Sequence, residues 1–498
     1  MKFYHPWYFF CLMIFGIFHL SSVGAQTSAA EIRIVYVSNT TDMESQPGVG
    51  GLSELSNLVK SLRSQGRNVL FLHGGRALGP SPMGSFDKGV HMVDLLNNLE
   101  PDVMSVGQGE FSYSEDELSL RAREASFPII SSNLKDSRSR ALLEGLHPWQ
   151  ILRVGKFKVG VLSLVDPEVK INYLLSRTDV GDPEASLRKQ ALELRKQGAQ
   201  LLVLMTDFGG LYIEKVLKEG LIDLVFETSL GGDPRGMVQG KGFHVLFSTF
   251  DRAAVVGLTQ VQGVWKSSIE WPLLKDIRPD PEIARIISGY VQRLSRLLDV
   301  EIGKITTPLD TQRSVVRIQE TAFGNLVADA LRVQTNSQLA LINTGAIRGN
   351  RLYEAGTQFT HRMIKSELPH RNIVVKLEVT GQMLMDALEN GLSRIEDQRG
   401  RFPALSGMIV TYLSNPVQDL RVVSVKIAGE DLVREKIYTL ATVNFLADGG
   451  DDYIMFKGAL RNSLAGEVIL SDMVAAYIQK YKPLGPKVEG RLVPVIQP

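Results

Sequence analysis

The chain contains the stretch Leu341-Ile342-Asn343-Thr344-Gly345-Ala346-Ile347-Arg348, in which an apolar run ends in a polar turn. The apolar run predicts a strand over residues 339–343. Gly345 permits the unusual backbone dihedrals of a tight turn, or a close approach of a ligand to the main chain. Arg348 follows directly, and its guanidinium group can donate two parallel hydrogen bonds to a phosphate or a carboxylate. The stretch therefore predicts a strand end that binds an anion.

Residues suited to a polar ligand also occur on either side of this strand. Arg317 precedes a helical segment over residues 321–334, and a later segment places Phe445 and Asp451 close together. Further periodic segments predict a helix over 380–393 and strands over 374–378, 408–412 and 422–427. Strands and helices mixed in this way predict an α/β domain over residues 301–492.

The three clusters together resemble the C-terminal domain of the 5′-nucleotidase family, which includes UDP-sugar hydrolases and ecto-5′-nucleotidases. Short supporting motifs follow in the order of that family, namely Leu368-Pro369, Thr380-Gly381, Leu388-Glu389, Ser406-Gly407 and Val488-Glu489-Gly490-Arg491. The resemblance implies a site for a nucleotide, a nucleoside or a nucleotide sugar. It assigns the phosphate to Arg317 and Arg348, the base to Asn343 and Phe445, and the ribose hydroxyls to Asp451.

One motif departs from the family. A Leu-Pro-Phe motif in the family places a second aromatic ring against the base, whereas this chain has Leu368-Pro369-His370. An imidazole ring can stack on a base, but it offers less area and titrates near neutral pH. His370 is therefore expected to line the ligand site, while the identity of the base stays open.

The N-terminal half alternates β-rich runs with amphipathic helical segments. Strands are predicted over residues 32–37, 68–72, 103–106, 127–131, 159–164, 201–204 and 224–226, and helices over 52–62, 90–99 and 185–197. This alternation predicts a layered α/β domain over residues 31–270. An apolar stripe that includes Ile287, Val291 and Leu294 then predicts a linker helix over residues 279–300.

The first domain resembles the metallophosphoesterase domain of the same family. That domain is an α/β sandwich. Its Asp, Asn and His side chains, on loops after the strands, hold two divalent metals. The matching loops of this chain have lost that set of ligands. The positions concerned are Ser38, Thr40, Arg76, Gln108, Gly109, Asp207 and Ser229.

Arg76 bears most directly on metal binding. It stands at the position of the carboxylate that bridges the two metals in the family, and arginine keeps its proton. A pair of like unit charges at about 4 Å costs roughly 4 kcal/mol at an effective dielectric constant of about 20. We therefore expect no metal cofactor and no catalytic residue, and a salt bridge from Arg76 to a residue such as Asp207. The alternatives are a direct contact from Arg76 to an anion, and a substitute metal cluster of His73, Asp207, Glu227 and Asp42.

The N-terminus and the composition indicate in which compartment the protein is found. Lys2, an apolar stretch over residues 7–20 and small residues up to Ala25 predict a signal peptide over residues 1–25. The one cysteine, Cys11, lies within it, so we expect an exported chain without disulfides, periplasmic or secreted. No later segment is long and apolar enough to span a membrane. A net charge of +1 argues against nucleic-acid binding.

Three functions remain open from the sequence. The preferred one is an exported, catalytically inactive 5′-nucleotidase-like protein that binds a nucleotide, nucleoside or nucleotide sugar through its C-terminal domain. The second is an active metal-dependent phosphohydrolase of nucleotide catabolism, which requires two divalent metals. The third is an interaction or scaffold protein in which both sites are relics, with a protein partner still to be identified.

Overall fold

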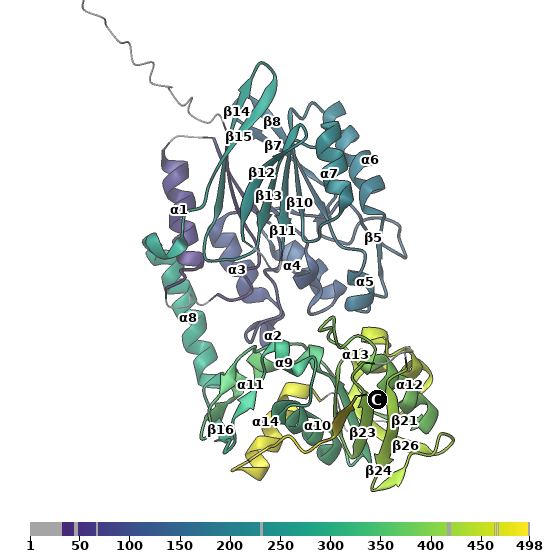
Figure 1. Ribbon diagram of the computed structural model, residues 1–498. Helices are drawn as coiled ribbons and strands as arrows, with labels where there is room; N and C mark the ends of the chain where they lie inside the picture. Colours follow the sequence, from purple (N-terminus) through teal and green to yellow (C-terminus); the bar gives the residue numbers. More distant parts are fainter. Residues whose placement is uncertain are drawn as a thin grey trace, which may run out of the picture.

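The computed structural model describes residues 32–496 except 44–47, 66–67, 230–232, 416–419, 463, 465 and 467. Within this part the chain forms two lobes, which the long helix α8 (Pro281–Leu298) connects along one side of the molecule (Figure 1). The expected mixed α/β architecture is confirmed. The predicted signal peptide, residues 1–25, lies outside the described residues.

Two β-sheets packed face to face form the first lobe. One has the order β15 (Val264–Glu270), β14 (Ala254–Val261), β1 (Ile32–Val37), β2 (Val69–His73), β3 (Val103–Ser105), β4 (Ile129–Ile130) and β6 (Leu146–His147). The other has the order β12 (Arg235–Gln239), β13 (Gly242–Phe247), β11 (Leu224–Thr228), β10 (Leu201–Thr206), β8 (Phe157–Leu164) and β7 (Gln150–Val154). Fully buried side chains, among them Phe71 and Phe226, fill the space between the sheets.

Helices flank this sandwich, and two of them anchor the linker (Figure 1). They are α1 (Leu52–Ser64), α3 (Val90–Leu99), α4 (Glu115–Glu124), α6 (Pro183–Lys196) and α7 (Leu211–Glu219). Both α1 and α3 pack against α8. Asp280 caps the start of α8, because its carboxylate accepts hydrogen bonds from the Glu282 N–H at 3.0 Å and from the Ser56 hydroxyl at 2.6 Å.

Parallel strand pairing gathers several loops at one edge of the sandwich. Strands β1, β2 and β3 run parallel in the first sheet, as do β8, β10 and β11 in the second. The carboxyl ends of parallel strands share one edge of a sheet, where ligands bind in folds of this class. The loops after β1, β2, β3, β10 and β11 carry Ser38, Arg76, Gln108, Asp207 and Ser229 respectively.

The second lobe has its own apolar core. Its larger sheet has the order β22 (Pro403–Ser406), β18 (Leu339–Asn343), β26 (Ile437–Val443), β21 (Val374–Thr380) and β27 (Leu460–Asn462). A second sheet has the order β25 (Glu430–Asp431), β24 (Val422–Ile427), β23 (Met408–Leu413) and β28 (Leu492–Val495). The helices are α9 (Arg313–Val316), α10 (Ala322–Gln334), α11 (His361–Glu367), α12 (Gly381–Leu392), α13 (Asn444–Ala447) and α14 (Leu470–Tyr481).

Short elements complete the two lobes and shape their contact. The small strand pairs are β5 (Leu134–Asp136) with β9 (Thr178–Val180), β16 (Glu301–Lys304) with β20 (Gln358–Thr360), and β17 (Leu309–Asp310) with β19 (Leu352–Tyr353). The short helices near the contact are α2 (Gly84–Asp87), η1 (Gln108–Phe111), α5 (Val169–Asn172) and η4 (Gly450–Asp452). In particular, α5 of the first lobe contacts η4 of the second.

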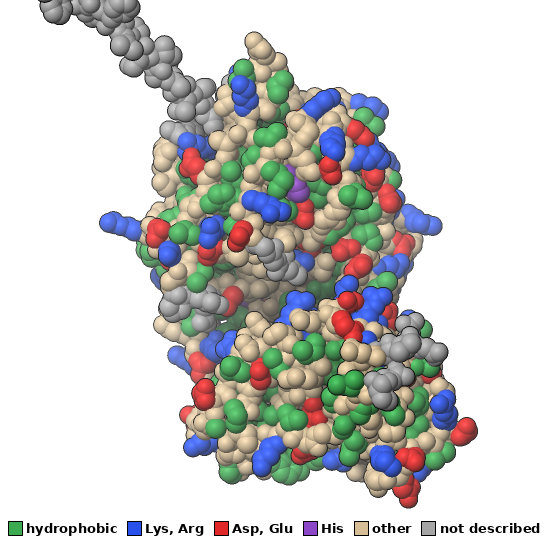
Figure 2. Space-filling model, viewed as in Figure 1, with side chains coloured by type: hydrophobic (Ala, Val, Ile, Leu, Met, Phe, Trp, Pro, Cys, Tyr) green, Lys and Arg blue, Asp and Glu red, His purple; other side chains and the backbone are tan. Residues whose placement is uncertain are grey.

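The described surface has a hollow between the lobes (Figure 2), and no helix of the described residues could span a membrane. None of the helices in the described part of the chain has the length and apolar character needed to cross a bilayer. Figure 2 shows a hollow where the two lobes meet, with basic side chains along the side formed by the second lobe.

Candidate functional site

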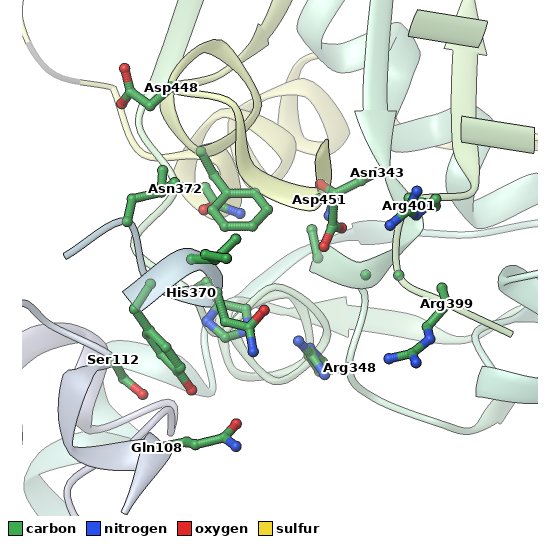
Figure 3. Close-up of a pocket in the computed structure, with 18 of the residues that line it drawn as sticks. Gln108, Ser112, Asn343, Arg348, His370, Asn372, Arg399, Arg401, Asp448 and Asp451 are labelled. Atoms are coloured by element: carbon green, nitrogen blue, oxygen red, sulfur yellow. The ribbon is translucent and has the colours of Figure 1, made fainter. Parts of the chain in front are cut away.

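A cleft of about 740 Å³ lies where the two lobes meet, and side chains of both lobes line it. Figure 3 shows Gln108 and Ser112 reaching in from the first lobe, opposite Arg348 of the second. All seven residues that the sequence assigns to a ligand site line this cleft. They are Arg317, Asn343, Gly345, Arg348, His370, Phe445 and Asp451.

Two arginines give the cleft a positive charge that the protein leaves uncompensated. Arg317 is only 6% exposed, yet it has no carboxylate partner within the described structure; it donates to the Gln398 carbonyl at 3.1 Å, and its Nε has no acceptor. Burial, together with the charges of Arg313 and Arg348, lowers the pKa of Arg317 to about 10. The Arg348 guanidinium is accessible from the cleft but has protein around it, and this desolvation lowers its pKa as well. An anion in the cleft would stabilise both charges.

Asn343 and Asp451 meet at the end of strand β18. The Asn343 amide donates to Asp451 Oδ2 at 2.6 Å, which leaves Asn343 Oδ1 buried without a donor. Burial raises the pKa of Asp451, whereas the bond from Asn343 lowers it. Gly345 lies against another glycine, since an added Cβ would be 2.8 Å from Gly400 Cα. The turn after β18 therefore requires glycine because two backbone segments touch there.

An aromatic ring and an imidazole ring line the cleft close to this turn. Phe445 lies over the backbone of Gly450, where an added Cβ would be 2.5 Å from its ring. The His370 Nε2 atom is buried without a partner. Burial, with a smaller effect from Arg348, lowers the pKa of His370 to about 3. The expectation that this ring titrates near neutral pH is therefore wrong, because the imidazole is desolvated and lies near a cation.

The cleft also contains arginines that the sequence analysis did not single out. Seven arginines and four carboxylates line it, which is an excess of three positive charges. The additional arginines are Arg313, Arg371, Arg394, Arg399 and Arg401. One of them, Arg401, pairs with Asp452 at 2.5 Å. The four-residue spacing between Arg313 and Arg317 was a signal in the sequence that could have revealed Arg313.

Where the family resemblance places metal ligands, the first lobe has a buried network of hydroxyl groups. The Tyr36 hydroxyl lies 2.8 Å from Thr228 Oγ1, and Thr228 donates to Ser38 Oγ at 2.8 Å. The Tyr36 ring stacks on Phe226 with a centroid separation of 4.2 Å. Burial raises the pKa of Tyr36, so its hydroxyl stays protonated at neutral pH. Neutral groups therefore occupy this part of the loop cluster.

Thr40 and His73 form a second neutral pair. Thr40 Oγ1 lies 2.9 Å from His73 Nε2, and the Gly75 N–H donates to His73 Nδ1 at 3.2 Å. Since Nδ1 accepts that bond, the ring proton is on Nε2 and points toward Thr40. Burial lowers the pKa of His73 to about 3. Both ring nitrogens are engaged, so His73 has no lone pair available for a metal.

Arg76 lies beside Asp207. Its Nη2 is 3.4 Å from Asp207 Oδ2, and the Asp207 side chain is fully buried. The same oxygen accepts a bond from the Gln108 N–H at 2.7 Å. Burial raises the pKa of Asp207, and the charge of Arg76 counteracts that rise. Glu110 fixes the Arg76 loop, because its carboxylate accepts bonds from the N–H groups of Arg76 and Ala77 at 2.9 and 2.7 Å.

Two further positions in these loops lack room or side chains for a metal ligand. A Cβ atom on Gly109 would lie 2.7 Å from the Gly79 carbonyl oxygen and 3.0 Å from Arg76 Cα. A histidine at this position would therefore require the backbone to move. Ser229 follows β11, where its N–H donates to the Phe247 carbonyl at 2.7 Å.

The substitute cluster of His73, Asp207, Glu227 and Asp42 is not formed. Glu227 lies 2.9 Å from His244, while His73 and Asp207 have the partners described above. Across the described residues, no group of three or more His, Cys, Asp or Glu side chains is placed to hold a metal ion. The residues at the loop edge of the first lobe therefore do not fit the two divalent metals that the family resemblance implies.

The chain is similar to 5′-nucleotidases along most of its length. Residues 301–458 match the family model described as 5′-nucleotidase, C-terminal domain. The snake venom 5′-nucleotidase of Crotalus adamanteus is 26% identical over 496 residues, which cover 89% of this chain and 83% of that protein. The 5′-nucleotidase of Homo sapiens is 25% identical over 492 residues, which cover 89% of this chain and 85% of that protein.

A solved structure shares the fold of both lobes. The crystal structure of the 5′-nucleotidase precursor from Thermus thermophilus aligns with a TM-score of 0.76 at 22% sequence identity. The alignment covers 94% of this chain and 100% of that one. The first lobe thus has the metallophosphoesterase fold and the second the 5′-nucleotidase C-terminal fold, which confirms both resemblances.

Proposed function

As a member of the 5′-nucleotidase family, the chain has both domains of a nucleotide-processing enzyme, and we propose that it binds its ligand in the cleft without hydrolysing it. The ligand is a nucleotide, a nucleoside or a nucleotide sugar. The observation that carries the proposal is the Arg76–Asp207 ion pair, which lies where the family resemblance requires a carboxylate between two metals.

Unsatisfied polar atoms in the cleft support ligand binding. Arg317 Nε and Asn343 Oδ1 are buried without a hydrogen-bond partner in the described structure. A buried polar group left in this state costs about 1–3 kcal/mol. A ligand that carries donors, acceptors and an anionic group would satisfy these atoms. The excess of positive charge favours a phosphorylated ligand over a neutral nucleoside.

Each part of such a ligand has a group suited to it. Arg348 and Arg317 would bind the phosphate oxygens through charge-assisted hydrogen bonds. The exposed face of Phe445 would stack on the base, while Asp451 would accept hydrogen bonds from ribose hydroxyls. These assignments follow the family resemblance and use the side chains that line the cleft.

Hydrolysis would need a base or a metal at the first lobe to activate water, and the loop residues described above supply neither. His73 has a pKa of about 3 and uses both ring nitrogens. Asp207 is held by Arg76 and by the Gln108 N–H. The hydroxyl groups of Ser38 and Thr40 are neutral ligands that bind divalent metals weakly.

We further propose that the protein is exported and carries out this binding outside the cytoplasm. The predicted signal peptide motivates this proposal, and one relative is a venom protein. Detection of the chain in the periplasm or culture medium, with residues 1–25 removed, would support it. Retention of the complete chain in the cytoplasm would contradict it.

Calorimetry with the mature protein tests ligand binding directly. Adenosine, AMP and UDP-glucose are titrated in turn, with the Arg348→Ala variant as the comparison. We expect at least one phosphorylated compound to bind more tightly than adenosine and to lose affinity in the variant. Absence of binding by all three at millimolar concentration would favour a scaffold protein with relict sites.

A further inference from the structure

Tyr173 brings an aromatic hydroxyl from the first lobe into the ligand cleft. It follows α5, where its N–H donates to the Val169 carbonyl at 3.0 Å, and Leu174 after it has a φ of 52°. This turn directs the ring to the cleft, with Phe111 behind it at a centroid separation of 6.2 Å. No hydrogen bond of the Tyr173 hydroxyl occurs within the described part of the chain. The hydroxyl is therefore available to a ligand.

Charges of both signs lie around Tyr173, namely the cations Arg76 and Arg348 and the carboxylates Glu110 and Asp207. Burial raises its pKa, and the positive charges of Arg76 and Arg348 counteract part of that rise. The phenol is thus protonated at neutral pH and can donate a hydrogen bond. Arg348 belongs to the second lobe, and it lines the same cleft as Tyr173 of the first lobe. An anion bound by Arg348 would be within the same part of the cleft.

Gln108 is a second neutral donor from the first lobe. The bond from its N–H to Asp207 fixes its backbone, and its side-chain amide makes a long contact of 3.4 Å with Asp166 Oδ2. One amide hydrogen therefore remains for a ligand. Figure 3 shows the amide pointing toward the side of the cleft where Arg348 and His370 lie.

The two lobes touch directly beside these groups. Helix α5, which precedes Tyr173, contacts η4, which contains Asp451. A ligand held by Arg348 and Asp451 would consequently be bounded on one side by the first lobe. The first lobe presents neutral donors there instead of metals.

We propose that the anionic group of the ligand is bound between the lobes, by Arg348 from the second lobe and by the Tyr173 hydroxyl and the Gln108 amide from the first. This inference rests on the proposed function and goes beyond it. Ligand binding then stabilises the contact between the lobes. The first lobe of this chain thereby contributes binding contacts to the ligand and takes no part in a chemical reaction.

Affinity for AMP tests the contribution of the first lobe. The Tyr173→Phe and Gln108→Ala variants are each expected to bind AMP about tenfold to a hundredfold more weakly, as is usual for loss of a hydrogen bond to a charged group. Adenosine affinity should be unchanged in both variants. The control is Tyr212→Phe, another first-lobe tyrosine, whose hydroxyl lies near Thr206 and Phe208 and does not line the cleft.

Hydrogen exchange with and without AMP provides a readout of the contact between lobes. Slower amide exchange over residues 169–174 in the presence of AMP is expected for the wild-type chain, and little change for Arg348→Ala. Near-ultraviolet circular dichroism of each variant establishes that it is folded. If the wild type binds AMP and only Arg348→Ala weakens it, with unchanged exchange over 169–174, the inference fails while the proposed function stands. Failure of the wild type to bind any phosphorylated compound contradicts both.

Discussion

The guanidinium group of Arg76 lies 3.4 Å from the carboxylate of Asp207, and both side chains belong to loops at the carboxyl ends of strands. Asp207 is fully buried, so its negative charge depends on Arg76 and on the Gln108 N–H for compensation. The positive charge of Arg76 and the negative charge of Asp207 therefore compensate each other at this loop edge. Breaking it should affect the stability of the first lobe more than ligand binding.

The Arg76→Met variant tests this relationship. Removal of one partner leaves a buried carboxylate unpaired, and we expect the free energy of unfolding to fall by about 3–5 kcal/mol. Urea denaturation followed by circular dichroism measures the change. The double variant Arg76→Met with Asp207→Asn should recover part of the loss, because the buried charge is then gone. A single variant as stable as the wild type would show that Asp207 does not need its partner.

Removal of the Arg317 charge should instead raise the stability, because this buried charge has no carboxylate partner in the described structure. We expect Arg317→Met to raise the free energy of unfolding by about 1–2 kcal/mol. The same substitution should weaken AMP binding about tenfold to a hundredfold, since the phosphate loses a charge-assisted hydrogen bond. The control for both measurements is Arg278→Met, because Arg278 is exposed and does not line the cleft. A destabilised Arg317→Met variant would contradict the account of an uncompensated charge.

His73 predicts a specific dependence of stability on pH. Its pKa is about 3 in the folded protein, below the value of 6.5 for a free imidazole. Between these values the unfolded state binds a proton that the folded state does not, so stability falls as the pH is lowered from about 6.5 toward 3. The contribution is about 1.4 kcal/mol per pH unit. The His73→Gln variant should show a slope smaller by that amount between pH 6 and pH 4, and an unchanged slope would sink the assignment of a buried neutral ring.

His370→Phe would restore the second aromatic ring that the family places against the base. A phenylalanine ring offers more stacking area, and aromatic pairs contribute about 0.5–1.5 kcal/mol beyond burial. We expect adenosine and AMP to bind about threefold to tenfold more tightly, as measured by calorimetry. His361→Phe, in the same domain but outside the cleft lining, should leave both affinities unchanged. Weaker binding in His370→Phe would indicate that the imidazole is itself a hydrogen-bonding contact.

The sequence was informative wherever local patterns determine the structure. The apolar run before Asn343 forms β18, and the stripe of Ile287 and Leu294 forms the buried face of α8. The family resemblance also singled out seven residues that are far apart in the sequence and that the fold brings into one cleft.

Features that depend on tertiary contact were missed. Tyr173 reaches the ligand cleft only because α5 packs on the opposite lobe, and its own segment has no periodic signal. Arg399 and Arg401 enter the cleft through the backbone contact of Gly400 with Gly345, which links segments far apart in the chain. The pKa of His370 likewise depends on burial that composition does not reveal.

Metal content and phosphate release, measured together on the full mature chain, test the central claim most directly. The protein is incubated with excess manganese, zinc or cobalt, freed of unbound ions and analysed for metal, and AMP hydrolysis is followed in the same samples. We predict no stoichiometric metal and no phosphate above the buffer control, in protein that binds AMP by calorimetry. Two equivalents of metal per chain together with phosphate release would contradict the account.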